Sequence, residues 1–265
     1  MPKHKRHKPT QTRRTKPFYD GWTTSQRIEA AKAKMNGLIG HLQYLLAIQA
    51  NNTLIVYSSV LSSQIPRSYA ANAFNVFQRS AHQFEVMRLC ALWDDVGKHR
   101  ESIPTVVALV DDEEVIEALA AEMRAHWDNI GAGRHSDLDK NDQEAAAAID
   151  RRYGTERAAK VRTDLKAAIK KSKAVQKSPK LKSLMNARHK HLAHNLSATK
   201  HELRGLPLRP LRYGDPAHFS RRSIPIAEAL YCGVNGASFS FEDSRRFYRK
   251  AAKSLWRGCK VNVRD

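Results

Sequence analysis

Apolar residues recur at steps of three and four along most of the chain, and this spacing indicates helices. The clearest repeat follows Thr23 and consists of Ile28, Ala31, Met35, Leu38, Leu42 and Leu45. Thr23 and Gln26 have the spacing of a capping box, which predicts that a long helix begins there. No segment alternates apolar and polar residues with the period of two that is typical of strands. We therefore expect an all-α fold.

The same repeat predicts two helical segments after the first helix. A shorter stretch at 53–65 ends at Pro66, because proline interrupts a helix. A longer helix then begins near Pro66 and runs to Asp95. The apolar stripe expected on this longer helix consists of Ala70, Phe74, Phe77, Ala81, Phe84 and Ala91.

The middle of the chain predicts further helices. One begins in the acidic run 111–114, which suits the positive end of a helix dipole, and stops at the glycines of 131–133. Two helical segments, 142–152 and 155–172, are expected on either side of Gly154.

The last third of the chain changes character. Ser178 followed by a proline predicts the start of a helix at 179–195. Frequent glycine and proline then predict a loop-rich segment at 205–225. Two shorter helices are expected near 226–232 and 241–257.

These patterns divide the chain into three parts. Residues 1–20 form a basic tail that lacks apolar residues for a core, so we expect it to be disordered when free. Residues 21–204 form a helical bundle with long antiparallel helices. Residues 205–265 form a loop-rich, helical extension that packs on the bundle.

The charge balance indicates the class of partner. The chain has 46 Lys and Arg against 26 Asp and Glu, a net charge of +20. Such a surface favours a polyanion, with nucleic acid first and an anionic membrane surface second, since each neutralised phosphate releases counterions. Three widely spaced cysteines form no disulfide framework, which favours a reducing compartment and a cytoplasmic location. No apolar run approaches the ~18 residues that span a bilayer.

Charged residues stand where core residues are expected. Arg188 follows Leu181 and Leu184 on the stripe of the 179–195 helix. The helix that ends near residue 95 shows the same anomaly, since the ionic residues on or beside its stripe are Glu85, Arg88, Asp94 and Asp95. Burying a guanidinium costs several kcal/mol unless it is paired. The two helices therefore either pair their charges in a structural network or point them into a functional cavity or interface.

Arg188 also opens the segment Arg188-His189-Lys190-His191-Leu192-Ala193-His194. This segment resembles the signature of HEPN domains, in which an arginine is followed directly by a polar residue and, a few positions later, by a histidine. The segment 84–94 also resembles the long helix of the abortive-infection branch of the HEPN superfamily. The resemblance covers roughly residues 25–200.

The resemblance implies a HEPN-like helical bundle, and many HEPN domains are metal-independent endoribonucleases that act as dimers. It further implies a toxin or anti-phage effector of abortive infection. In such a site Arg188 binds the charged phosphoryl oxygens, and His194 transfers protons near neutral pH. His189 stands at the polar position, where many members carry Asn or Asp, and His191 supports the site.

The spacing of the motif constrains the geometry of this site. Arg188 and His194 are six positions apart, about 120° around an ideal helix, so one regular helix does not bring them together. Either the helix unwinds near His194, or a second copy completes the site. The resemblance favours a homodimer whose paired motifs face one cleft. RNA is then the substrate, and a toxin of this kind leaves room for an antitoxin or regulatory partner.

The predicted helix at 241–257 supplies a second basic element. With Phe247, Ala251 and Leu255 directed inward, its outward face carries Arg245, Arg246, Arg249, Lys250, Lys253 and Arg257. This face could follow an RNA backbone, although a solvated surface is an equally simple interpretation.

Two other functions remain open. The charge alone is sufficient for a non-catalytic RNA-binding or regulatory protein, and an internal ion network fits a structural dimerisation module. The three histidines of the motif invite a metal site, but no nearby Cys, Asp or Glu completes a ligand set. We expect no metal ion, no cofactor and no membrane association.

Overall fold

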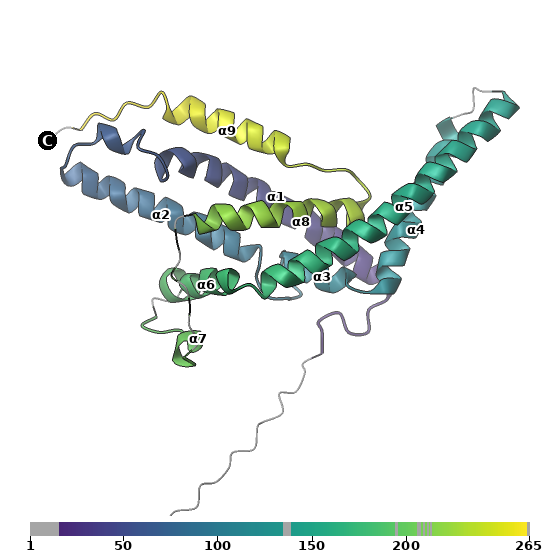
Figure 1. Cartoon of the computed structure of the whole chain (residues 1–265), viewed down its shortest axis with the longest axis horizontal. Coiled ribbons are helices and arrows are strands. Elements are labelled where there is room, and N and C mark those ends of the chain that lie inside the picture. Colours follow the sequence, from purple (N-terminus) through teal and green to yellow (C-terminus); the bar gives the residue numbers. More distant parts are fainter. Residues whose placement is uncertain are drawn as a thin grey trace, which may run out of the picture.

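The computed structural model describes residues 16–134, 139–193, 196–205, 208, 210, 212 and 214–263. Within these ranges the regular structure is helical and no residue lies in a β-strand, which confirms the all-α prediction. The expected N-terminal tail lies outside the described residues as far as residue 15. Figure 1 shows a bundle of long helices from which one helical hairpin projects.

Helix α1 (Thr24–Ile55) is the central element, since it packs against α2, α3, α4, α8 and α9. The predicted capping box closes its first turn. Thr23 Oγ1 accepts a hydrogen bond from the Gln26 backbone N–H at 3.2 Å, and Gln26 Oε1 accepts one from the Thr23 N–H at 2.9 Å. All six residues of the predicted stripe are buried. Both the start and the inner face of this helix are therefore confirmed.

The chain after α1 differs from the prediction. The helix continues to Ile55, because Leu54 and Ile55 are buried, and only a 3-10 turn, η1 (Ser62–Gln64), follows. The separate helical stretch predicted at 53–65 is therefore wrong. Ser58 offers a physical reason, since its hydroxyl donates to the Leu54 carbonyl and accepts from a backbone N–H two residues later, in competition with the helix.

Helix α2 (Tyr69–Ala91) forms where a helix was predicted, but its buried face is a different one. The buried side chains are Glu85, Val86, Leu89 and Cys90. Phe77 is 47% exposed and Phe84 is 41% exposed, so the predicted stripe is wrong. Polar side chains of α1 occupy the contact with α2 and pair with Glu85, which turns the phenylalanines toward solvent.

Helices α4 (Glu113–Arg134) and α5 (Lys140–Gln176) form the projecting hairpin (Figure 1). Neither predicted break is present, since α4 continues past the glycines of 131–133 and α5 continues through Gly154. Gly154 is buried, and a Cβ atom there would lie 3.0 Å from the Cβ of Trp127. The glycine therefore serves close packing of the two helices and does not end a helix.

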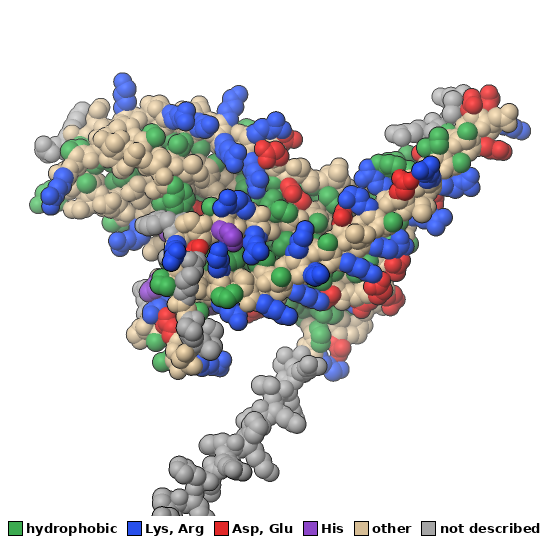
Figure 2. Space-filling model, viewed as in Figure 1, with side chains coloured by type: hydrophobic (Ala, Val, Ile, Leu, Met, Phe, Trp, Pro, Cys, Tyr) green, Lys and Arg blue, Asp and Glu red, His purple; other side chains and the backbone are tan. Residues whose placement is uncertain are grey.

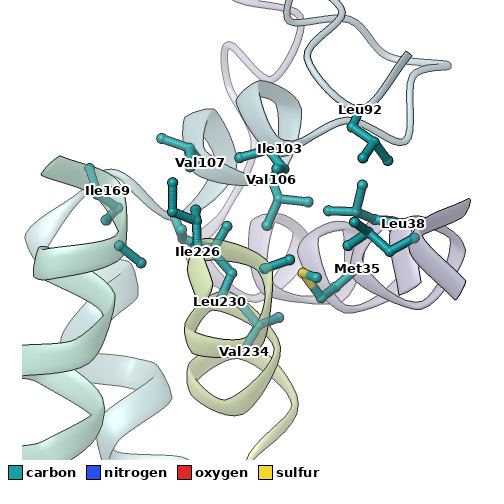
Figure 3. Packing of buried hydrophobic residues seen from close by; sticks show 14 of the residues in the cluster. Met35, Leu38, Leu92, Ile103, Val106, Val107, Ile169, Ile226, Leu230 and Val234 are labelled. Carbon is teal, nitrogen blue, oxygen red and sulfur yellow. The ribbon is translucent and has the colours of Figure 1, made fainter. Parts of the chain in front are cut away.

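The core lies where α1, α3 (Ile103–Val110), α5 and α8 (Asp215–Asn235) meet (Figure 3). Met35 and Leu38 of α1, Val106 of α3 and Leu230 of α8 are buried in this one cluster. The segment after residue 205 thus supplies a helix to the main core as well as packing on the bundle.

The loop-rich segment predicted at 205–225 is wrong from Asp215 onward, where α8 begins. Pro216 lies in the first turn, where a backbone N–H has no partner in the helix, so proline fits there. Pro225 lies inside the helix on its exposed side. The apolar residues around it, Ile224 and Ile226, are buried and keep the helix on the core.

Helix α9 (Glu242–Trp256) confirms the predicted last helix but not its inner face. Ala252 is buried in a small cluster with Ala50 and Leu54 of α1. Trp256 packs beside them, and its Nε1–H donates to Asn51 Oδ1 at 2.6 Å. The side chains predicted to point inward, Phe247, Ala251 and Leu255, are exposed. A small residue and an aromatic residue with a hydrogen-bond donor fit the α1 surface better than this apolar stripe.

Candidate functional site

The histidine-rich motif lies on an unusual piece of helix. After Ser178, whose hydroxyl caps the first turn, α6 (Pro179–Ala187) ends one residue before Arg188. The chain continues as a π-helical segment, η2 (Arg188–Ala193), which packs against the end of α2. A single α-helix to residue 195 was predicted, and the π form replaces its second half. Insertions of this type are frequent at functional sites.

Arg188 forms an ion pair with the end of α2. Its Nη1 lies 2.6 Å from Asp94 Oδ1, and the side chains are 20% and 23% exposed. Pairing of charges between these two helices was one of the predicted outcomes, and this contact confirms it. In the described part of the chain, Asp94 is the only hydrogen-bond acceptor of the guanidinium. Nε and Nη2 therefore keep N–H groups that can bind an anion.

A buried cysteine lies beneath this pair. Cys90 of α2 is 0% exposed, and its Sγ lies 3.7 Å from the Leu184 carbonyl of α6. Burial raises the pKa of Cys90 to about 12, although the charge of Arg188 acts in the opposite direction. Cys90 therefore packs α2 against α6 as a neutral thiol.

Two histidines of the motif face outward, whereas Leu192 packs against the core. His189 and His191 are exposed, and His194 lies outside the described residues. Lys190 pairs with Glu202 of α7 (Lys200–Leu203) at 3.0 Å. A backbone N–H of Thr199 and the Lys190 ammonium both lower the pKa of Glu202, which stays ionised and ties α7 to the motif.

The remaining predicted supporting residues lie elsewhere. Arg88 donates to His41 Nδ1 at 3.0 Å and stacks over the Tyr44 ring at 5.0 Å, so it faces α1. Glu85 also faces α1, and Asp95 is exposed. Of the predicted supporting residues, only Asp94 contacts Arg188 within the described ranges.

Two partners of the predicted residues carried no sequence signal. His41 accepts from Arg88 through Nδ1, and its Nε2 lies 3.0 Å from Glu101. Because His41 occupies an α1 position beside the apolar stripe, periodicity gives no indication of its role. Glu202 is likewise joined to Lys190 across a loop, where helical spacing does not apply.

Comparison with known proteins decides the family. The model of the HEPN family AbiU2 matches residues 34–255, most of the chain. The chain belongs to the AbiU2 family of HEPN proteins. No curated protein and no solved structure matches it. The match extends well beyond the roughly 25–200 expected from the motif, so α8 and nearly all of α9 belong to the region that defines the family.

The AbiU2-family chain carries a second basic surface on α9. Arg246, Arg249, Lys250 and Lys253 line one open groove, and Figure 2 shows Lys and Arg side chains over this helix and along α5. Arg245 is half-buried and lies 3.8 Å from Glu242, which neutralises part of its charge. Of the six cations predicted on the outward face, five are exposed, and only Arg245 is half-buried.

Two further features of the AbiU2-family chain concern ligands and membranes. Within the described ranges, no three His, Cys, Asp or Glu side chains gather closely enough to hold a metal ion. None of the described helices is both long and apolar enough to cross a bilayer.

The ion pair beneath the motif leads to a stability prediction. Asp94→Ala leaves the largely buried guanidinium of Arg188 without its acceptor, and we expect the free energy of unfolding to fall by about 1–2 kcal/mol. Asp95→Ala removes an exposed carboxylate one residue away and serves as the control, with an expected change under about 0.5 kcal/mol. Urea unfolding monitored by circular dichroism measures both, and equal effects would contradict a stabilising role for the pair.

Proposed function

We propose that this AbiU2-family protein is a metal-independent endoribonuclease that acts on RNA through Arg188, His194 and His189. The hydrogen-bond donors that Arg188 keeps beside its ion pair support this function. Asp94 holds the guanidinium on one side, while Nε and Nη2 meet no acceptor among the described residues. A guanidinium oriented in this way presents a planar pair of donors that suits a phosphate group.

The chemistry needs few other groups. The RNA 2′-hydroxyl attacks the adjacent phosphorus, the bond from phosphorus to the 5′-oxygen breaks, and the products are a 2′,3′-cyclic phosphate and a 5′-hydroxyl. The 2′-hydroxyl loses one proton and the leaving 5′-oxygen gains one, so the overall proton count balances. In our proposal His194 carries out one of these two transfers and solvent water carries out the other. Arg188 stabilises the negative charge on the phosphoryl oxygens. His189, which is exposed next to Arg188, orients the phosphate.

An exposed apolar surface supports the proposed homodimer. The α2 patch consists of Phe77, Phe84 and Met87 of α2 together with the neighbouring Tyr44 of α1. Each of these side chains is between 41% and 48% exposed. Tyr44 and Phe84 stack edge to face with ring centroids 6.0 Å apart. Met87 lies in the last two turns of α2, which ends at Ala91, and Asp94, the partner of Arg188, follows three residues after that end. A second copy bound here would bring another histidine-rich motif toward the same cleft.

Changing one residue of the α2 patch tests the dimer. Phe84→Glu places a charge in the centre of the proposed interface, and we expect the dissociation constant of the dimer to rise by at least about tenfold. Sedimentation equilibrium measures the change. Ile149→Glu on the α4–α5 hairpin is the matched control, because Ile149 is 68% exposed and lies outside the patch. A dimer unaffected by Phe84→Glu would place the interface on another surface.

The proposed activity is tested directly on the wild-type protein. Incubation with RNA in excess EDTA is expected to produce fragments that carry 2′,3′-cyclic phosphates and 5′-hydroxyls. New 5′-hydroxyl ends accept label from polynucleotide kinase without prior phosphatase treatment, whereas 5′-phosphate ends do not. Fragments with 5′-phosphates would contradict the mechanism. RNA that is bound in a salt-dependent manner but left intact would favour the non-catalytic RNA-binding alternative.

A further inference from the structure

An apolar stripe on the outer face of α9 is exposed to solvent. It consists of Phe247, Ala251 and Leu255, which follow one another at steps of four and therefore lie on one side of the helix. Phe247 is 67% exposed, Leu255 is 60% exposed, and Ala251 between them is exposed as well. Helix α9 lies at the edge of the bundle with α1 beside it (Figure 1), so this side of α9 is open to a partner. We call these three residues the α9 stripe.

The α9 stripe is not the surface that holds α9 on the bundle. Ala252 and Trp256 make the contact with α1, and Trp256 Nε1–H donates to Asn51 Oδ1. The Phe247 ring contacts the Tyr248 ring edge to face, with centroids 5.5 Å apart, and Tyr248 is half-buried against the core. Helix α9 therefore has two apolar surfaces, one that packs on α1 and one that faces solvent with its phenylalanine held in place.

Cations border the α9 stripe along one edge only. At about 100° per residue they occupy one arc beside the stripe, whereas the other edge leads to the side that packs on α1. The cations of this arc are Arg246, Arg249, Lys250, Lys253 and Arg257. Within the described residues, no carboxylate lies within 4.0 Å of Arg249, Lys250 or Lys253. A ligand that fits this surface is therefore apolar along one side and acidic directly beside it.

Four other occupants fit this surface less well. An RNA backbone would neutralise the cations, but bases stack on aromatic rings, and two of the three stripe residues are aliphatic. A helix in a membrane surface has headgroups on both flanks, whereas only one flank of the α9 stripe carries cations. A second copy of the chain would place the same cations against one another. Residues 1–15 contain no Asp or Glu, so they do not supply the acidic side.

We propose that the α9 stripe and its bordering cations dock an acidic amphipathic helix of a partner protein. Apolar residues of the partner helix, spaced at three and four, cover the stripe, and carboxylates on one side of that helix pair with Lys250 and Lys253. From Phe247 to Leu255 the stripe extends about 12 Å along the helix axis, which about two turns of a partner helix cover. The proposal does not rest on RNA cleavage, since none of these residues contacts Arg188 or Asp94.

A synthetic helix tests this docking surface on the full chain. The probe is a fluorescein-labelled peptide of about 18 residues, long enough to form a helix, with leucines on one face and glutamates on the other. We expect saturable binding in fluorescence anisotropy at physiological salt. A second peptide of the same composition has its leucines spread around the helix, so it keeps the charge but lacks the apolar face. This second peptide should bind at least about tenfold more weakly.

Two pairs of variants locate the bound peptide. Leu255→Ser removes an apolar side chain of the α9 stripe and should weaken peptide binding by about tenfold. Ile149→Ser is its control, because Ile149 is an exposed apolar residue of α5, and it should change affinity less than about twofold. Lys253→Glu should also weaken binding by about tenfold. Lys170→Glu on α5 changes the net charge equally at another exposed position, and its effect should stay below about threefold.

Several results would overturn the proposed docking of an acidic helix. Equal binding of the two peptides, or equal losses in Leu255→Ser and Ile149→Ser, would show that charge alone attracts the peptide. Vesicles of phosphatidylserine and phosphatidylcholine form a separate arm. If they bind the wild type but not Leu255→Ser, and the peptide does not bind, the surface belongs to a membrane. A 2′-O-methyl RNA hexanucleotide that binds more tightly than the peptide, and more weakly in Leu255→Ser, would assign the surface to RNA. None of these outcomes depends on whether Arg188 supports cleavage.

Discussion

Arg188→Ala is expected to lower the rate of RNA cleavage in EDTA by about 100-fold to 1,000-fold. The guanidinium is the proposed phosphate ligand, and its Nη1 is held by Asp94 Oδ1 at 2.6 Å. Losing a preoriented donor of this kind removes stabilisation that acts mainly in the transition state. His194→Ala should slow cleavage by a similar factor, since it removes the group that we propose for proton transfer. Single-turnover rates on a defined RNA, determined by gel electrophoresis, give both values.

The controls separate catalysis from folding and from general charge. Arg152→Ala removes an exposed arginine of α5 that pairs with Glu156, and we expect its cleavage rate to stay within about twofold of wild type. Arg188→Lys keeps the charge but loses the planar fork, so it should recover only part of the rate. Cleavage that is equal in wild type, Arg188→Ala and His194→Ala would rule out the proposed site.

Glu85→Ala is expected to lower the free energy of unfolding by about 3 kcal/mol or more, the largest stability effect of any single change considered. The carboxylate is 1% exposed and accepts three hydrogen bonds, from Gln49, Asn52 and Tyr57. Alanine removes the acceptor that these three donors share, although each of them keeps another partner, as Asn52 does with the Ala81 carbonyl. Differential scanning calorimetry should show a fall in melting temperature of roughly 5–10 °C.

A matched carboxylate shows whether burial causes this effect. Glu156→Ala removes an exposed ion pair on α5, and its effect should be about 0.5 kcal/mol or less. Glu85→Gln keeps the shape but points an amide N–H₂ at donors, so its stability should fall between wild type and Glu85→Ala. A melting temperature unchanged by Glu85→Ala would show that water accepts the hydrogen bonds in place of the carboxylate.

The sequence predicted the parts of the fold that depend on local spacing. In α1, the stripe from Ile28 to Leu45 and the capping box at Thr23 both follow from a helix that buries one continuous apolar face. The same reasoning chose the wrong face on α2 and α9. On α2 the carboxylate Glu85 makes the contact with α1, and on α9 the small residue Ala252 makes it. A search for large apolar residues at helical spacing detects neither of them.

One contact of the candidate site, between Arg188 and Asp94, was predictable, but the geometry around it was not. Arg188 was predicted as a site residue because it is a charged residue on an apolar stripe. Its partner Asp94 was predicted because the preceding helix shows the same anomaly. The π-helical form of η2 was not predictable, because it depends on how the backbone turns after Ala187, and residue spacing carries no sign of it. The cavity that Glu85 lines was not predictable either. Residues of α1, α2, α8 and α9 form it together, and no spacing along the sequence indicates that these helices meet there.

The place of α8 in the core has a consequence for how the protein is made. Its buried residues, such as Leu230 and Val234, complete a cluster whose first members, such as Ile28, are made roughly 200 residues earlier. At about 5–20 residues per second, a ribosome needs about 10 to 40 s to make that stretch. Until α8 is made, the faces of α1 and α5 that pack against it stay uncovered, so this core cannot close before the last third of the chain is made. The core that supports the ion pair between Arg188 and Asp94 is therefore completed only late in translation.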